Sequence, residues 1–123
     1  MNGLKLVAFA ATSRSDEART FYSQILGFPV LDDTPFALVL DANGTTLRVQ
    51  KVEKVLPPPY TVLGWAVDNI SSAVTQLTES GVKFERFQGL DQGDLGIWTA
   101  PGGASVAWFR DPDGNLLSLT QDD

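Results

Sequence analysis

Apolar positions in the first third of the chain change from a strand pattern to a helix pattern. Leu4 to Ala11 is almost continuously apolar, which is typical of a strand covered on both faces. The next apolar residues recur at helical spacing, and they are Ala18, Phe21, Tyr22 and Ile25. Ser13 or Ser15 is expected to cap this helix, and Gly27 is expected to end it in a left-handed conformation.

Three short strands are expected after this helix. They are Phe28 to Leu31, Phe36 to Leu40 and Thr45 to Val52. Asn43 and Gly44 tolerate positive φ, so they indicate a tight hairpin between the second and the third of these strands. The first part of the chain is therefore expected to form a strand, a helix and three strands.

The second part of the chain repeats this order. Pro57-Pro58-Pro59 cannot donate backbone hydrogen bonds, which favours a joint between two parts. Thr61 to Val67 is expected to be a strand, Asp68 or Asn69 a helix cap, and Gly81 the end of that helix. The apolar stripe of the helix consists of Ile70, Ala73, Val74 and Leu77. The strands expected after it are Val82 to Phe87, Gly96 to Ala100, Ala104 to Arg110 and Leu116 to Thr120.

This repetition predicts an α+β fold in which one domain, residues 1–123, contains two βαβββ modules at about 1–56 and about 60–121. A hydrophobic content of 43% is enough for a core. The net charge of −6 argues against nucleic acid and against an anionic membrane as partners. No leader peptide or membrane-spanning apolar run is visible, so a cytoplasmic protein is expected.

Histidine and cysteine are both absent from the sequence. Imidazole and thiolate, which Zn, Fe, Ni and Cu favour, are therefore missing as ligands. The remaining oxygen ligands suit Mg or Ca better. Nucleophilic catalysis by Ser-His-Asp or Cys-His groups is also impossible. Glu85, Asp91 and Asp94 would act as general bases only if burial raised the pKa of their carboxyl groups.

Three segments carry a resemblance to a known family: Ala18 to Phe28, Gly64 to Ile70 and Ala107 to Asn115. In these motifs the chain resembles the vicinal oxygen chelate superfamily, which includes glyoxalase I, extradiol dioxygenases, fosfomycin-resistance enzymes and bleomycin-resistance proteins. The resemblance covers essentially the whole chain and implies a curved cup of mixed sheet made by the two modules. The motifs have structural roles, so they indicate the fold more than a function.

In metal-bearing members of this superfamily, the ligands occupy four inward-facing strand positions. The resemblance places these positions at Val7, Arg48, Val62 and Ser118. Valine has no lone pair, arginine stays protonated, and a serine hydroxyl is a poor lone ligand. We therefore expect no metal and no other cofactor, which argues against metal-dependent glyoxalase or dioxygenase activity.

Strand residues alternate between the two faces of a sheet, so these four positions also identify the neighbours that line the cup. The candidate ligand-binding residues are Lys5, Phe9, Arg48, Gln50, Trp108, Arg110 and Ser118. Trp98 is a weaker candidate. Rings and cations of this kind suit a flat apolar molecule with a negative charge, and Gly64 is expected to leave room for it. Alternatively, the rings fill the cup and the cations pair with acidic residues.

Three functions stay open. The leading hypothesis is metal-independent binding of a small aromatic or anionic molecule, in the manner of the antibiotic-sequestering members, with no catalytic residue. The second is an enzyme of the same superfamily: a metal-dependent one, or a cofactor-free lyase or isomerase in which Arg48, Arg110 or Lys5 stabilises an anion. The third is an interaction or regulatory subunit with a closed cup. The resemblance also implies a homodimer.

Overall fold

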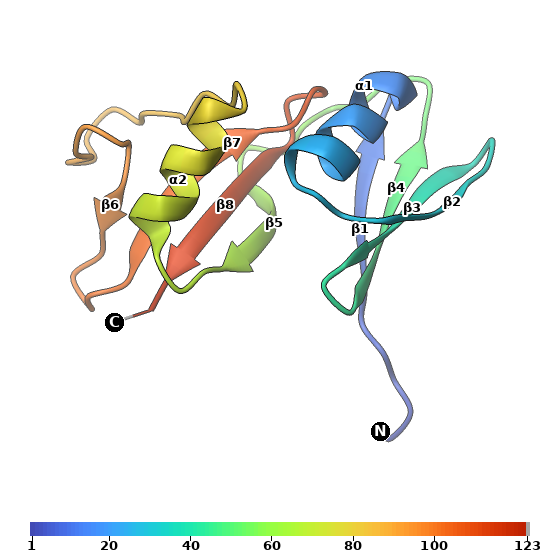
Figure 1. Cartoon of the computed structure of the whole chain (residues 1–123), viewed down its shortest axis with the longest axis horizontal. Helices are drawn as coiled ribbons and strands as arrows, with labels where there is room; N and C mark the ends of the chain where they lie inside the picture. Colours follow the sequence, from blue (N-terminus) through green and yellow to red (C-terminus); the bar gives the residue numbers. More distant parts are fainter. Residues whose placement is uncertain (123) are drawn as a thin grey trace. The chain divides into compact units, whose positions relative to one another are not determined.

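The computed structural model describes residues 1–122. The chain divides between Pro57 and Pro58 into two compact units, and each unit has the order βαβββ (Figure 1). The prediction of an α+β fold with two such modules is confirmed. Within the described residues, no helix has both the length and the apolar character needed to cross a membrane.

Unit 1 is a four-stranded mixed sheet with one helix. Its elements are β1 (Val7–Thr12), α1 (Ser15–Thr20), a π-helical turn η1 (Phe21–Ile25), β2 (Val30–Asp33), β3 (Ala37–Ala42) and β4 (Thr45–Lys51). The strand order is β1-β4-β3-β2, in which β1 runs parallel to β4 and the other pairs are antiparallel. The predicted hairpin is confirmed, because Asn43 and Gly44 both have positive φ.

The core of unit 1 lies between α1 and one face of this sheet. Alternate residues of the strands are buried there, as are the apolar residues of the helix and the π-helical turn. These residues are Ala10, Ala18, Phe21, Tyr22, Leu38, Leu40, Leu47 and Val49. Arg19 of α1 also forms an ion pair with Asp33 of β2. Asp33 is in register with Leu38, so this ion pair lies on the same face of the sheet. The other face of the sheet carries no helix of this unit.

Unit 2 repeats this arrangement. Its elements are β5 (Thr61–Ala66), α2 (Ile70–Glu79), β6 (Trp98–Thr99), β7 (Ser105–Arg110) and β8 (Leu116–Gln121), with the strand order β5-β8-β7-β6. Helix α2 packs on β7 and β8 (Figure 1). The buried residues between them are Ile70, Val74, Ala107, Phe109, Leu117 and Leu119. Asn69 caps α2 by accepting a hydrogen bond from Ser72 N at 3.0 Å, in agreement with the sequence.

Three local expectations are wrong. The N-cap residue of α1 is Arg14, which makes no side-chain cap, and Ser15 is the first residue of the helix. The strand expected at 82–87 does not form, because this segment makes only one backbone hydrogen bond to β7, from Glu85 N to Trp108 O at 2.8 Å. The strand expected at 96–100 is reduced to Trp98–Thr99.

Candidate functional site

The face of the unit 1 sheet opposite α1, here called the helix-free face of unit 1, is centred on Arg48. Arg48 lies on β4, a central strand, and its in-register neighbours are Phe9 on β1 and Val39 on β3. Leu47 and Val49, the residues on either side of Arg48, are buried under α1. Because successive strand residues point to opposite faces, Arg48 projects away from the helix.

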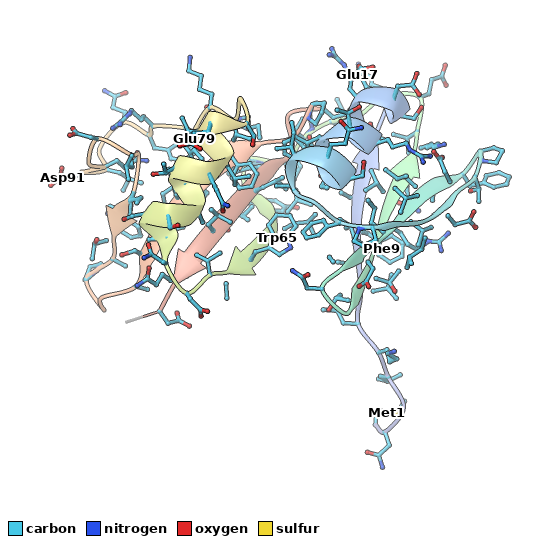
Figure 2. The ribbon with its side chains drawn as sticks, viewed as in Figure 1. Met1, Phe9, Glu17, Trp65, Glu79 and Asp91 are labelled. Atoms are coloured by element: carbon cyan, nitrogen blue, oxygen red, sulfur yellow. The ribbon has the colours of Figure 1, made fainter. Side chains whose placement is uncertain are left out.

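The Arg48 guanidinium has no hydrogen bond and no ion pair to any of residues 1–122. The side chain is half-buried, and Arg48 is in register with Phe9, which is 48% exposed. Figure 2 labels Phe9 on β1. Asp32 and Asp41 lie on the same face by register, but each accepts a backbone hydrogen bond, from Asp33 N and Gly44 N. The five N–H donors of this guanidinium are therefore available to a ligand.

The other candidates of unit 1 lie nearer its margins. Gln50 is exposed at the end of β4, in register with Ala11 and Ala37. Lys5 is exposed in the segment that precedes β1, so the sheet does not position it. Figure 2 labels Met1 at the free end of this segment, well away from the strands.

On the face of the unit 2 sheet opposite α2, here called the helix-free face of unit 2, three rings form a cluster. Trp108 of β7 lies 5.3 Å from Phe87 between ring centroids, in a T-shaped arrangement. It lies 6.1 Å from Trp98, with the two ring planes inclined by 33°. All three rings are half-buried, so each keeps some exposed surface. We call Phe87, Trp98 and Trp108 the aromatic wall.

Arg110 pairs with an acidic residue, which is the alternative that the sequence left open for the cations. Its Nε donates to Glu85 Oε1 at 2.6 Å, and its Nη1 donates to Gly114 O at 3.0 Å. This guanidinium already has partners, so a ligand would have to compete with them. The structure thus distinguishes Arg48, a cation without a partner among residues 1–122, from Arg110.

Ser118 and Gly64 face each other across β8 and β5, and Ser118 also pairs with Trp108 across β8 and β7. Ser118 is only 8% exposed. A Cβ added at Gly64 would lie 2.8 Å from Ser118 Oγ. The absence of a side chain at Gly64 therefore makes room for the serine hydroxyl, while Gly64 itself is exposed, so the room it leaves for a ligand stays a prediction.

The residues at the four positions implied for metal ligands do not fit a metal ion. Val7 and Val62 offer no donor atom, Arg48 is cationic, and Ser118 offers one hydroxyl. The sequence contains no histidine or cysteine. Residues 1–122 also contain no group of three or more acidic side chains placed to hold a metal ion.

Two residues that organise the site were missed by sequence reasoning. Phe87 was assigned to a strand, and Gln92 was given no role, although its side chain holds the backbone that carries Phe87. Both lie between α2 and β6 in a segment without regular structure. No apolar periodicity identifies such residues, because their contacts depend on side-chain hydrogen bonds to the backbone.

A cavity of about 260 Å³ lies elsewhere in unit 2, and none of the candidate residues lines it. Val82, Phe84 and Leu95 give it apolar walls, while Lys83, Arg86 and Asp94 add charge. Its volume is slightly below the range usual for ligand pockets. This cavity is therefore separate from the candidate residues of unit 2.

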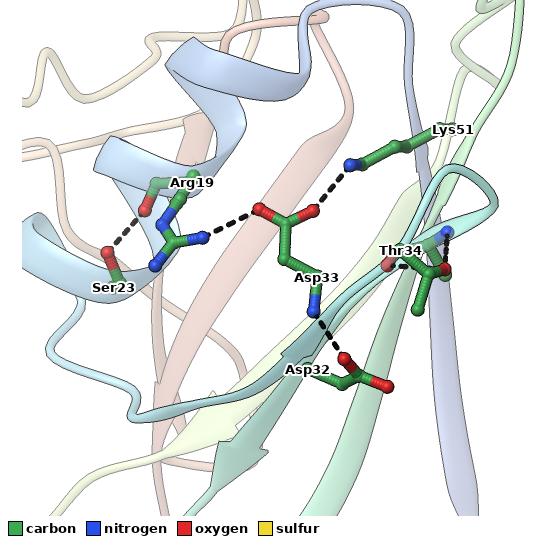
Figure 3. Close-up of polar contacts among 7 residues, drawn as sticks. Arg19, Ser23, Asp32, Asp33, Thr34 and Lys51 are labelled. Atoms are coloured by element: carbon green, nitrogen blue, oxygen red, sulfur yellow. Dashed lines mark hydrogen bonds and ion pairs between the residues drawn. The ribbon is translucent and has the colours of Figure 1, made fainter.

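Asp33 has a pKa that clearly departs from its ordinary value, and this residue lies on the helix side of unit 1. Hydrogen bonds from Lys51 and Arg19 lower the pKa of Asp33 below 3.8. Figure 3 shows this carboxylate between the two cations. The cluster links α1, β2 and β4, so it stabilises the fold and takes no part in the candidate site.

Comparison with known proteins agrees with this architecture. No curated protein matches the chain. A solved structure of TnmS3, an antibiotic binding protein from Streptomyces sp. CB03234, is 26% identical with 100% of both chains covered and a TM-score of 0.71. A superfamily member from Sphaerobacter thermophilus DSM 20745 is 25% identical, with 97% of this chain and 98% of that chain covered and a TM-score of 0.70.

Lactoylglutathione lyase from Agrobacterium tumefaciens has a TM-score of 0.74 over 98% of this chain and 95% of that chain. Its identity of 12% shows a shared fold alone. The sequence model of one family matches residues 5–119, which is nearly the whole chain. The chain therefore belongs to the Glyoxalase/Bleomycin resistance protein/Dioxygenase superfamily.

Proposed function

We propose that this protein binds a small planar molecule with a negative charge, without a metal ion, and holds it without converting it. The observation that carries the proposal is the Arg48 guanidinium, which has no partner among residues 1–122 and lies between Phe9 and Val39. A guanidinium matches a carboxylate or a similar anion with two parallel hydrogen bonds. The exposed part of Phe9 adds apolar surface for a ring next to that charge.

The chemistry of the site favours binding over turnover. A sequestering protein needs affinity but no stabilisation of a transition state. The residues implied as metal ligands cannot act as such, and the sequence has no histidine or cysteine to serve as a base or nucleophile. The likeness to an antibiotic binding protein at 26% identity supports the same class of function.

A cofactor-free lyase or isomerase is the second candidate, and the same observation supports it. A guanidinium without a partner can stabilise an anion that forms during a reaction as well as one that is already present. The two candidates differ in product formation. Turnover of a carboxylate substrate that persists in a chelator and is lost in Arg48→Ala would favour the enzyme.

We also propose that the protein is a homodimer. Leu4 and Leu6 are 71% and 79% exposed, and they precede β1, which lies at an edge of its sheet. Exposed apolar residues next to an edge strand are typical of a surface that pairs with another chain. Sedimentation velocity tests this proposal: a dimer is expected, and a monomer at all concentrations would contradict it.

The proposed function is tested by calorimetric titration with 2-naphthoate, a flat carboxylate, in buffer that contains EDTA. Charged hydrogen bonds contribute about 1.5–3 kcal/mol each, so Arg48→Ala should weaken binding by roughly tenfold or more. Arg14→Ala removes an exposed cation from the same unit and should leave the affinity unchanged. Equal affinity of wild type and Arg48→Ala, or no binding to either, would contradict the proposal.

A further inference from the structure

We propose that Gln92 is a positioning residue that holds the aromatic wall in place, and that this wall stacks flat rings in preference to saturated ones. The inference goes beyond the proposed function, because it concerns a surface of unit 2 alone. Gln92 acts through Phe87 and Trp98, the two rings that contact Trp108.

The wall combines one ring from a regular strand with two rings that need other support. Trp108 lies within β7, whose ladder with β8 continues on both sides of it. Phe87 lies in the segment between α2 and β6, outside any strand. Trp98 begins β6, which has only two residues. The positions of Phe87 and Trp98 therefore depend on contacts other than a strand ladder.

The Gln92 side chain supplies these contacts with its whole amide group. Its Oε1 accepts from Phe87 N at 2.7 Å, while its Nε2 donates to Glu85 O at 3.0 Å and to Gly96 O at 2.8 Å. The backbone of Gln92 also forms an isolated bridge with Trp98. One half-buried side chain thus ties the stretch that carries Phe87 to the stretch that leads into Trp98.

Two further contacts fix this segment. Arg86 donates to Gln92 O at 3.1 Å and to Asp94 O at 2.8 Å, so its guanidinium closes the turn around Gln92. Glu85 joins the segment to β7 through its backbone N–H and through its ion pair with Arg110. These contacts explain how a stretch without regular structure holds two rings at defined positions.

A prearranged wall favours flat ligands for two reasons. A flat ring can stack on the exposed surface of the indoles, whereas a saturated ring cannot approach it as closely. Because the rings are already held by the segment, binding does not have to order them. Gln92→Leu keeps the approximate size of the side chain but leaves Phe87 N, Glu85 O and Gly96 O without their partner.

The positioning role is tested by circular dichroism, which needs no ligand. Two indoles as close as Trp98 and Trp108 give an exciton couplet whose size depends on their distance and angle. We expect Gln92→Leu to reduce the couplet strongly. Gln88→Leu, the same change at an exposed position of the same segment, should leave it intact. Trp98→Phe identifies the couplet by removing it.

Gln92→Glu provides a rescue that depends on pH. As a carboxylate, the new side chain still accepts from Phe87 N but repels the carbonyls of Glu85 and Gly96. Once protonated, it can donate to one of them. The couplet of this variant should therefore be weak at neutral pH and recover as the pH falls through the pKa of that carboxyl group. The wild-type couplet at the same pH is the reference, because Glu85, Asp91 and Asp94 are acidic side chains of the same segment and Glu85 pairs with Arg110.

Selectivity is tested with 2-naphthoate and its saturated counterpart, decahydro-2-naphthoate. Wild type should bind the flat acid about five- to tenfold more tightly, and Gln92→Leu should reduce this preference to roughly twofold or less by the same reasoning.

The outcomes separate the two proposals. Failure of wild type to bind 2-naphthoate would overturn the proposed function and the selectivity, while the couplet would still decide the positioning role. An unchanged couplet in Gln92→Leu would overturn that role. A lost couplet with an unchanged ratio of affinities would overturn the selectivity.

Discussion

Ser118 Oγ occupies the space into which a side chain at Gly64 would project. The two residues are in register across β5 and β8, and a Cβ at position 64 would lie 2.8 Å from this oxygen. The glycine therefore allows a buried hydroxyl to fit between two strands. Packing within unit 2 explains its presence without any reference to a ligand.

Gly64→Ala should lower the free energy of unfolding by about 1–3 kcal/mol, because overpacking forces the serine or the backbone to shift. Ser118→Ala in the same chain removes the oxygen and should recover most of this loss, so that the two effects are not additive. Urea denaturation of both single variants and the double variant measures this coupling. Gly102→Ala is the control, because no atom lies within 4 Å of its added Cβ. Additive effects would contradict the packing account.

Strand alternation and helical stripes were enough to predict the order of the elements, except for the strand expected at 82–87. They work because every residue in a regular element has its face set by its position, as Leu47, Arg48 and Val49 illustrate on β4. The same reasoning placed Arg48 and Phe9 on one face before their register was known. It gave no information on whether a cation on that face has a partner.

The structure of the segment between α2 and β6 could not be predicted from apolar periodicity. Its apolar residues suggested a strand, but Arg86 and Gln92 direct their hydrogen bonds to nearby backbone atoms and close the segment on itself. Arg110 was expected to be a ligand contact, and its ion pair with Glu85 could not be predicted from the sequence. Such pairings depend on side-chain geometry, which has no periodic signature in the sequence.

Asp33→Asn should make stability less dependent on acid pH. Because the ion pairs lower the pKa of this carboxyl in the folded protein, their contribution is present above the ordinary value of 3.8 and is lost as the pH falls through the lowered pKa. The contribution should be about 1 kcal/mol, since exposed ion pairs are weak. Chemical denaturation of wild type and variant from neutral to acid pH measures the difference.

The difference between wild type and Asp33→Asn should thus be constant near neutral pH and shrink under acid conditions. Asp68→Asn removes an exposed carboxylate that forms no ion pair with residues 1–122, and it should show no such trend. A difference that stays constant into the acid range would mean that the contacts of Asp33 with Arg19 and Lys51 do not stabilise the fold.

The turn after β7 depends on a buried pair of side chains. Asp111 Oδ1 accepts from the backbone N–H groups of Asp113 and Asn115, and Asp111 Oδ2 accepts from Asn115 Nδ2 at 2.8 Å. Asp111→Asn places its own amide N–H group opposite Asn115 Nδ2, so that two donors face each other. This change should lower the free energy of unfolding by about 1–3 kcal/mol. Adding Asn115→Asp restores one donor and one acceptor and should recover part of the loss. Asp91→Asn, an exposed loop change, should be neutral in the same urea experiment.

Metal analysis of the purified protein tests the interpretation of the four implied ligand positions. Because valine, arginine and serine occupy them, zinc, iron and nickel should be substoichiometric by elemental mass spectrometry. Dialysis against each of these ions should leave none bound, and EDTA should not change the unfolding temperature. A stoichiometric transition ion would overturn metal-independent binding and would favour an enzyme.

The account depends most on Arg48 as the group that binds an anion, and its own NMR signal reports this directly. The Nε–Hε resonance of Arg48, identified by its loss in Arg48→Lys, can be followed during titration with 2-naphthoate and with the neutral 2-naphthamide. The account predicts that this resonance shifts to saturation with the carboxylate and little with the amide, while the resonance of Arg110, already paired with Glu85, stays in place. An Arg48 resonance that stays constant while 2-naphthoate binds elsewhere on the protein would contradict it.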